Sequence, residues 1–194
     1  MLRYVLVFMK KKYIRGPKGS GSHLSISTFS QPALSLVPFR QRAGYCGPAS
    51  LKMIFNYYKK NIEESKIVNL LGLSSAIIRN RGVSSERLVE AAEKLGFHGF
   101  IKDYSTLEDI RKYVVQHKIP VIVDWFMDDE GHYSVVSGID EDNIYLVDPS
   151  LGQVRALRLP TFNRVWFDFS EAYLKSKKDL VLRRMIVISK KKLA

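Results

Sequence analysis

The segment Gln41–Met53, which reads QRAGYCGPASLKM, decides the fold of this chain. It holds Cys46, the single cysteine among the 194 residues. Pro48 follows at a place where the first turn of a helix tolerates a proline. Apolar residues then recur at helical spacing, at Leu51, Ile54, Phe55 and Tyr58. The pattern predicts an α-helix with Cys46 at its N-terminus.

Cys46 has the sequence surroundings of a reactive thiol. A lone cysteine is more often a small buried apolar residue, and it becomes a good nucleophile only where a helix N-terminus and an imidazole lower the pKa of a thiol. Gly44 and Gly47 let the backbone and a substrate carbonyl come close to the sulfur. A single cysteine also excludes an intrachain disulfide and a site of several thiolates, which fits a reducing compartment.

Three further helices are predicted between Cys46 and the middle of the chain. They cover Glu63–Leu71, Ser84–Gly96 with Ser84 as N-cap, and a stretch that opens at Ser105 with Glu108 at the capping-box spacing. We expect the Ser74–Gly82 link to be mobile.

The second half of the chain has the pattern of a β-sheet. Short runs rich in valine, isoleucine and aromatic residues alternate with acidic or glycine-containing turns, as is typical of strands. The predicted strands are Pro120–Trp125, Tyr133–Ile139, Ile144–Val147, Val154–Leu159 and Leu180–Ser189. A sheet half therefore follows a helical half.

Two residues near strand ends are candidates for a site with Cys46. His132 follows the turn Asp128–Gly131, so its ring is expected to project from the end of the sheet as a reachable base. Asp148 follows the next predicted strand and precedes Pro149. Alone it is more often an ordinary Asp-Pro turn residue, but its carboxylate can accept a hydrogen bond from an imidazole. The short Asp140–Asn143 turn between these strands allows the two side chains to lie side by side.

Other polar and aromatic residues are assigned structural roles. The remaining histidines, His23, His98 and His117, are expected at the surface, and Asp128–Glu130 lacks the ligand pattern of a calcium loop. Aromatic residues near strand ends are more often packing residues than a substrate platform; these are Trp125, Trp166, Phe167 and Phe169. We expect no metal and no cofactor.

The net charge of +12 lies at the two ends of the chain. Residues 1–45 carry eight Lys and Arg and no acids, and residues 171–194 carry eight against two, while the middle is nearly neutral. Basic ends around a neutral domain are usually solvated, so no nucleic-acid partner is expected. We divide the chain into a weakly ordered basic segment at 1–35, one domain at 36–189 and a basic tail at 190–194.

The N-terminal apolar run is too short for a membrane span. Tyr4–Met9 is also too short for the apolar region of a signal peptide, and the basic residues Lys10–Lys12 follow it rather than precede it. We therefore expect a soluble, cytoplasmic protein with no transmembrane segment.

The order of Cys46, His132 and Asp148 along the chain resembles that of the papain-like fold, and the local sequence resembles the C39-like peptidase family. Four stretches carry the resemblance: Gln41–Met53, Ile119–Trp125 (IPVIVDW), Gly131–Ile139 (GHYSVVSGI) and Ile144–Ser150 (IYLVDPS). It implies an α+β papain-like fold, in which an N-terminal helical half with the nucleophile at a helix N-terminus packs on a C-terminal antiparallel β-sheet.

The resemblance also implies a role for each site residue. Cys46 would be the nucleophile, His132 the general base and acid, Asp148 the residue that orients the imidazole, and Gln41 an oxyanion donor. Gln41 lies five residues before Cys46, whereas six is the spacing associated with the family, so its amide can be displaced. Alone, Gln41 is equally well a solvated loop residue.

The function predicted on this basis is that of a cysteine peptidase. It would hydrolyse a peptide bond of a peptide or protein substrate through a Cys-His-Asp triad and a thioester acyl-enzyme. One alternative is an acyl or peptidyl transferase of the same fold, because papain-like relatives such as phytochelatin synthases use the same acyl-enzyme. Another is a non-catalytic peptide-binding module. The substrate and the oligomeric state are left open.

Overall fold

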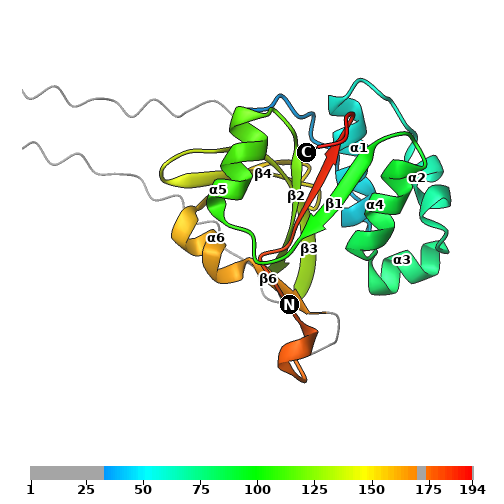
Figure 1. Ribbon diagram of the computed structural model, residues 1–194. Helices are drawn as coiled ribbons and strands as arrows, with labels where there is room; N and C mark the ends of the chain where they lie inside the picture. Colours follow the sequence, from blue (N-terminus) through cyan, green and yellow to red (C-terminus); the bar gives the residue numbers. More distant parts are fainter. Residues whose placement is uncertain (1–32, 170–173, 194) are drawn as a thin grey trace, which may run out of the picture.

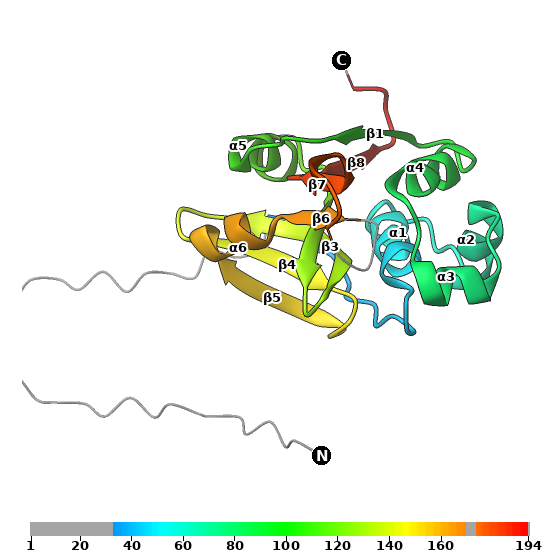
Figure 2. The same ribbon diagram turned by 90° about the horizontal axis from the view of Figure 1, so that it is seen from below.

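The structure is a computed structural model that describes residues 33–169 and 174–193. The predicted N-terminal segment, residues 1–35, lies almost wholly outside the described residues, as does His23. Helices α1 to α4 gather on one side of the molecule and the main sheet lies beside them (Figures 1 and 2). The predicted α+β architecture, a helical half packed on an antiparallel sheet, is confirmed. In the parts of the chain that the structure describes, no helix is long and apolar enough to cross a membrane.

The helical half begins at the cysteine. Helix α1 spans Cys46–Tyr57, α2 spans Glu64–Leu71, α3 spans Ser75–Arg81 and α4 spans Ser85–Glu93. The predicted helices α1, α2 and α4 are confirmed to within a few residues. Gly72 ends α2 in the left-handed conformation that glycine adopts readily, at φ 66°.

The Ser74–Gly82 link, predicted to be mobile, instead forms α3. Ser74 is the N-cap, and its side chain accepts a hydrogen bond from the Ile77 N–H at 3.3 Å. Ile78 is fully buried in the core. The cap and this one buried side chain hold a helix that is too short to show a clear apolar period.

The next helix begins one residue later than predicted. Thr106, not Ser105, caps α5 (Leu107–Arg111), and its reciprocal partner in the capping box is Asp109. The Ser105 hydroxyl is turned inward and donates to the carbonyl of Lys102 at 2.9 Å. A π-helical turn, η1 (Lys112–Gln116), continues α5.

Six antiparallel strands form the main sheet, in the order β1-β8-β2-β3-β4-β5. Their bounds are His98–Lys102 (β1), Val121–Met127 (β2), Glu130–Ile139 (β3), Asn143–Asp148 (β4), Gln153–Arg158 (β5) and Met185–Ser189 (β8). The remaining elements are α6 (Leu159–Val165), η2 (Lys177–Asp179) and a small sheet of β6 (Phe167–Phe169) and β7 (Leu180–Leu182).

One predicted strand needs correction, and one observed strand was not predicted. Leu180–Ser189 is not one strand: it breaks at Arg183, which has a positive φ of 49°, into β7 and β8 of different sheets. Strand β1 was not predicted; it begins at His98, which is exposed as expected, and its glycine and aromatic residues lack a clear alternation.

Helix α1 packs between the other helices and strand β3 of the sheet. Leu51, Ile54 and Phe55 are fully buried, and each such side chain contributes roughly 1.5–3 kcal/mol by leaving water. Ser50 on α1 also donates to the Tyr133 carbonyl of β3 at 3.5 Å. The N-terminus of α1 is therefore fixed against the strand that carries His132.

Candidate active site

Cys46 is the first residue of α1, as predicted. No side chain caps this helix, and Pro48 in its first turn has no N–H to satisfy. The positive end of the helix dipole therefore lies at the thiol. The side chain is partly exposed.

The turn before Cys46 requires glycine at position 44. Gly44 has φ +76°, and a Cβ built there would lie 2.6 Å from the carbonyl oxygen of Arg79 in α3. No other residue fits this conformation and this close approach without displacement. Contact with α3 therefore helps to place the thiol.

His132 is deeply buried in β3, with 2% of its surface exposed. The strand starts earlier than predicted, at Glu130, because Asp128 and Asp129 both take positive φ values in a two-residue hairpin turn. His132 is therefore the third residue of the strand and lies opposite Trp125 on β2. The two rings meet edge to face, with centroids 5.8 Å apart.

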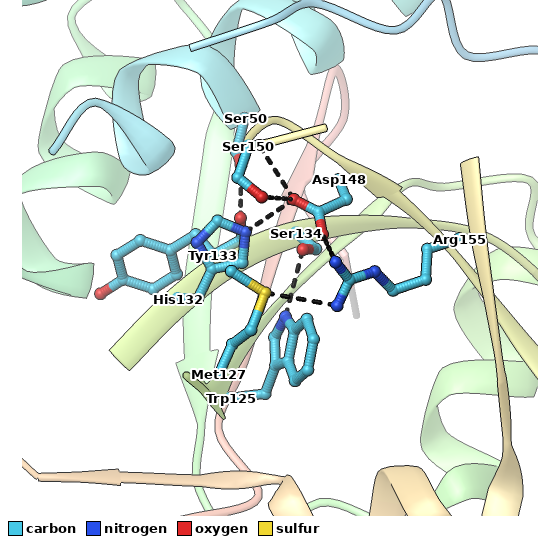
Figure 3. A network of polar contacts seen from close by, with 9 residues as sticks. All are labelled: Ser50, Trp125, Met127, His132, Tyr133, Ser134, Asp148, Ser150 and Arg155. Carbon is cyan, nitrogen blue, oxygen red and sulfur yellow. Dashed lines mark hydrogen bonds and ion pairs between the residues drawn. The ribbon is translucent and has the colours of Figure 1, made fainter. Parts of the chain in front are cut away.

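Asp148 accepts a hydrogen bond from His132, and the two side chains lie side by side as the predicted hairpin suggests. His132 Nε2 lies 2.9 Å from Asp148 Oδ1 (Figure 3). Ser150 donates to the same oxygen from its N–H at 2.9 Å and its hydroxyl at 2.8 Å. Because Nε2 is engaged by the carboxylate, Nδ1 is the nitrogen left to interact with Cys46, which lies close enough to raise the pKa of the imidazole.

These contacts shift the pKa values of both partners in the direction of an ion pair. Burial alone would lower the pKa of His132, but the hydrogen bond to Asp148, together with the interaction with Cys46, raises it to about 9. Burial likewise opposes ionisation of Asp148, yet the hydrogen bonds from His132 and Ser150 lower its pKa to about 2. A protonated imidazole beside Asp148 and Cys46 is therefore favoured at neutral pH.

A cleft of about 700 Å³ opens in front of Cys46 and His132. Gln41 lines the cleft from the loop before α1. Its backbone N–H donates to the carbonyl of Pro149, the residue after Asp148, at 2.8 Å. The structure thus brings together all four residues singled out from the sequence: Gln41, Cys46 and His132 line the cleft, and Asp148 lies behind the imidazole.

Two further carboxyl groups line this cleft and were missed from the sequence. Asp124 on β2 is 4% exposed and hydrogen-bonds Asp168 on β6. Burial, followed by the charge of Asp168, raises the pKa of Asp124 well above its ordinary value. Asp168 packs against Gly131, where a Cβ would lie 2.3 Å from its Oδ1. A charged residue within the apolar run IPVIVDW was the available signal for Asp124.

Two other partners of the triad candidate were also missed. Ser150 fixes Oδ1 of Asp148, as described above, and Arg155 on β5 makes an ion pair with its Oδ2 at 3.2 Å. Neither stands out in the sequence, because an arginine and a serine near a turn are ordinary surface residues.

The residues assigned structural roles mostly keep them. Trp125 and Trp166 are buried core residues, while Phe169 is half-buried and lines the cleft. His117 is exposed. Within residues 33–169 and 174–193, no cluster of three or more His, Cys, Asp or Glu could hold a metal ion.

Solved structures with a similar fold include peptidase domains. The peptidase domain of Streptococcus ComA, a bifunctional ABC transporter of a quorum-sensing pathway, superposes with a TM-score of 0.61 and 20% identity over 81% of this chain and all of that one. A double-glycine-motif protease from an AMS/PCAT transporter, in complex with its leader peptide, gives 0.60 and 20% over 83% and 95%. At these identities the likeness shows the fold.

Sequence relatives cover about two thirds of this chain. An uncharacterised protein of Methanothermobacter marburgensis is 28% identical over 130 residues, 66% of this chain and 80% of that protein. The transport/processing ATP-binding protein ComA of Streptococcus pneumoniae is 33% identical over 127 residues, 62% of this chain but only 16% of ComA. The model of the Peptidase C39 family matches residues 38–171, a stretch that contains Gln41, Cys46, His132 and Asp148. The chain therefore belongs to the peptidase C39 family.

Proposed function

We propose that this protein is a cysteine peptidase that cleaves a peptide bond with Cys46, His132 and Asp148. One observation carries the proposal: a buried imidazole hydrogen-bonds a buried carboxylate and interacts with Cys46, which lies at the N-terminus of a helix and at the edge of a cleft. This is the arrangement that activates a thiol and returns a proton to a leaving amine.

The chemistry follows from the position of each group. The Cys46 proton passes to His132 Nδ1, and the thiolate attacks the substrate carbonyl carbon. As the C–N bond breaks, His132 donates this proton to the leaving amine and a thioester remains on Cys46. A water molecule then gives a proton to His132 while its oxygen attacks the thioester. The C–S bond breaks, the acid product leaves, and the proton returns to the sulfur.

Asp148 keeps the imidazole productive throughout this cycle. Its bond to Nε2 fixes the tautomer in which Nδ1 faces the sulfur, and its negative charge stabilises the imidazolium. We propose Gln41 as an oxyanion donor together with the backbone N–H groups at the start of α1. Its place on the cleft beside Cys46 supports this role.

We propose a peptide as the substrate class. One neighbour of the same fold was solved with a leader peptide bound, which supports a peptide in the corresponding cleft here. Because the chemistry needs a reduced thiol, we place the reaction in the cytoplasm.

Alkylation of Cys46 by iodoacetamide, followed by mass spectrometry across the pH range, tests the proposal. We expect the wild type to react rapidly even near pH 6, and His132→Ala to lose this reactivity while reacting normally at alkaline pH. His117→Ala, which changes an exposed histidine, is the matched control and should behave as the wild type. A thiol that reacts slowly near pH 6 in the wild type contradicts the proposal. A positive result leads to a peptide-library search for the cleavage site.

A further inference from the structure

Arg155 contacts the candidate triad from the side opposite to His132. It lies on β5, and its side chain is 26% exposed. Its Nη2 is 3.2 Å from Asp148 Oδ2, while His132 binds Oδ1 of the same carboxylate. Figure 3 shows the Asp148 carboxylate between the imidazole and the guanidinium.

The second oxygen of Asp148 depends on this contact. Oδ1 receives the bonds from His132 and Ser150, whereas no hydrogen bond from the described residues reaches Oδ2, which is buried. A buried carboxylate oxygen without a balancing charge is strongly unfavourable. The ion pair with Arg155 therefore supplies the compensation and restrains rotation of the carboxylate about its Cβ–Cγ bond.

Arg155 also touches the aromatic neighbour of His132. Its guanidinium carbon lies 5.6 Å from the centroid of the Trp125 ring, within the range of a cation–π contact. Trp125 packs edge to face on the His132 ring, and its indole N–H donates to Ser134 Oγ at 3.1 Å. Nη1 of Arg155 further donates to Met127 Sδ at 3.3 Å.

We propose that Arg155 is a positioning residue for the reaction of Cys46. It holds the two groups that set the direction of the imidazole, the Asp148 carboxylate and the Trp125 ring, and it does so without contact to substrate. This inference rests on the proposed function. A planar guanidinium suits both contacts at once, whereas an ammonium can replace only the charge.

The test compares variants of the whole chain that each carry one substitution on β5. Arg155→Met removes the charge and both contacts, Arg155→Lys keeps the charge, and Arg158→Met is the matched control on β5, where Arg158 is exposed. Iodoacetamide is the probe for the thiol, and proton NMR monitors the hydrogen shared by His132 and Asp148. Thermal unfolding shows whether each variant folds.

We expect Arg155→Met to lower the alkylation rate near pH 6 by about tenfold. The rate at alkaline pH should be unchanged, because a thiol is deprotonated at alkaline pH without an activating imidazole. The low-field proton signal should weaken, and Arg155→Lys should recover part of both losses. Global destabilisation would not produce this dependence on pH. If Arg155→Met does not fold, the alkylation rates of Arg155→Lys near pH 6 and at alkaline pH test the proposal instead. The expected loss of rate near pH 6 is then smaller.

Each outcome separates this inference from the function on which it rests. A wild type that lacks His132-dependent alkylation near pH 6 overturns the proposed function. A wild type that shows it, with folded Arg155 variants that match the wild type in alkylation and in the NMR signal, overturns only the role of Arg155.

Discussion

The carboxyl group of Asp124 on β2 hydrogen-bonds that of Asp168 on β6, inside the cleft that Cys46 and His132 also line. Burial raises the pKa of both carboxyls, and at Asp124 the charge of Asp168 raises the pKa further. The pair therefore holds a proton more tightly in the folded protein than in the unfolded chain.

The first prediction follows from this tight proton. A raised pKa contributes stability that is complete below the unfolded value near 4 and is lost as the pH rises through the raised value. Asp124→Asn keeps a hydrogen bond to Asp168 without the ionisation. We expect it to be more stable than the wild type at about pH 8, by about 1–2 kcal/mol, and to show a smaller fall in stability from pH 5 to pH 8. Urea unfolding at both pH values measures the free energy of unfolding. An equal change in this free energy from pH 5 to pH 8 for the two proteins would contradict the prediction.

The second prediction concerns the charge on His132. In the folded protein its pKa is raised to about 9, so its contribution to stability is complete below about pH 6.5 and is lost as the pH rises through about 9. Asp148→Asn removes the hydrogen-bonded carboxylate and leaves burial to act against the imidazolium. We expect the pKa of His132 to fall by at least about one unit in an NMR titration. Asp142→Asn, in an exposed turn, is the control, and an unchanged His132 titration in Asp148→Asn would refute the assigned cause.

The third prediction separates thiol activation from oxyanion binding. Gln41→Ala should lower kcat for a cleaved peptide by about 10²–10³-fold if its amide binds the oxyanion. Alkylation by iodoacetamide forms no oxyanion, so its rate should stay at the wild-type value. Parallel measurement of peptide hydrolysis and alkylation decides the matter. Full hydrolytic activity in the variant would show that Gln41 is a loop residue without this role.

The fourth prediction tests the turn before the nucleophile. Gly44 and Gly96 have similar positive φ values, 76° and 80°, but a Cβ meets the Arg79 carbonyl at 2.6 Å only at Gly44. Gly96→Ala should therefore cost about 1 kcal/mol from backbone strain alone, while Gly44→Ala should cost at least about 1–2 kcal/mol more and also slow alkylation of Cys46. Thermal unfolding measures the loss of stability in both variants. Equal losses would contradict the prediction and would mean that α3 shifts to accommodate the added methyl group.

Local sequence patterns predicted most of the helices and strands near the site. The helical period after Cys46, the glycine after α2 and the serine before α4 all act within one or two turns, so they can be seen along the chain. Patterns failed where stability comes from packing between distant elements. Helix α3 depends on the burial of Ile78, and β1 depends on its pairing with β8.

For the candidate site, the sequence by itself predicted the helix-borne thiol and, from their places near strand ends, His132 and Asp148, and the resemblance of four stretches added Gln41. Only the tertiary structure decided what surrounds them. Arg155 reaches Asp148 because β5 pairs with β4 in one register, and Asp168 meets Asp124 because β6 returns beside β2. The physical reason is that these contacts join side chains from separate strands, and neither the spacing of those residues along the chain nor their type encodes the register that brings them together.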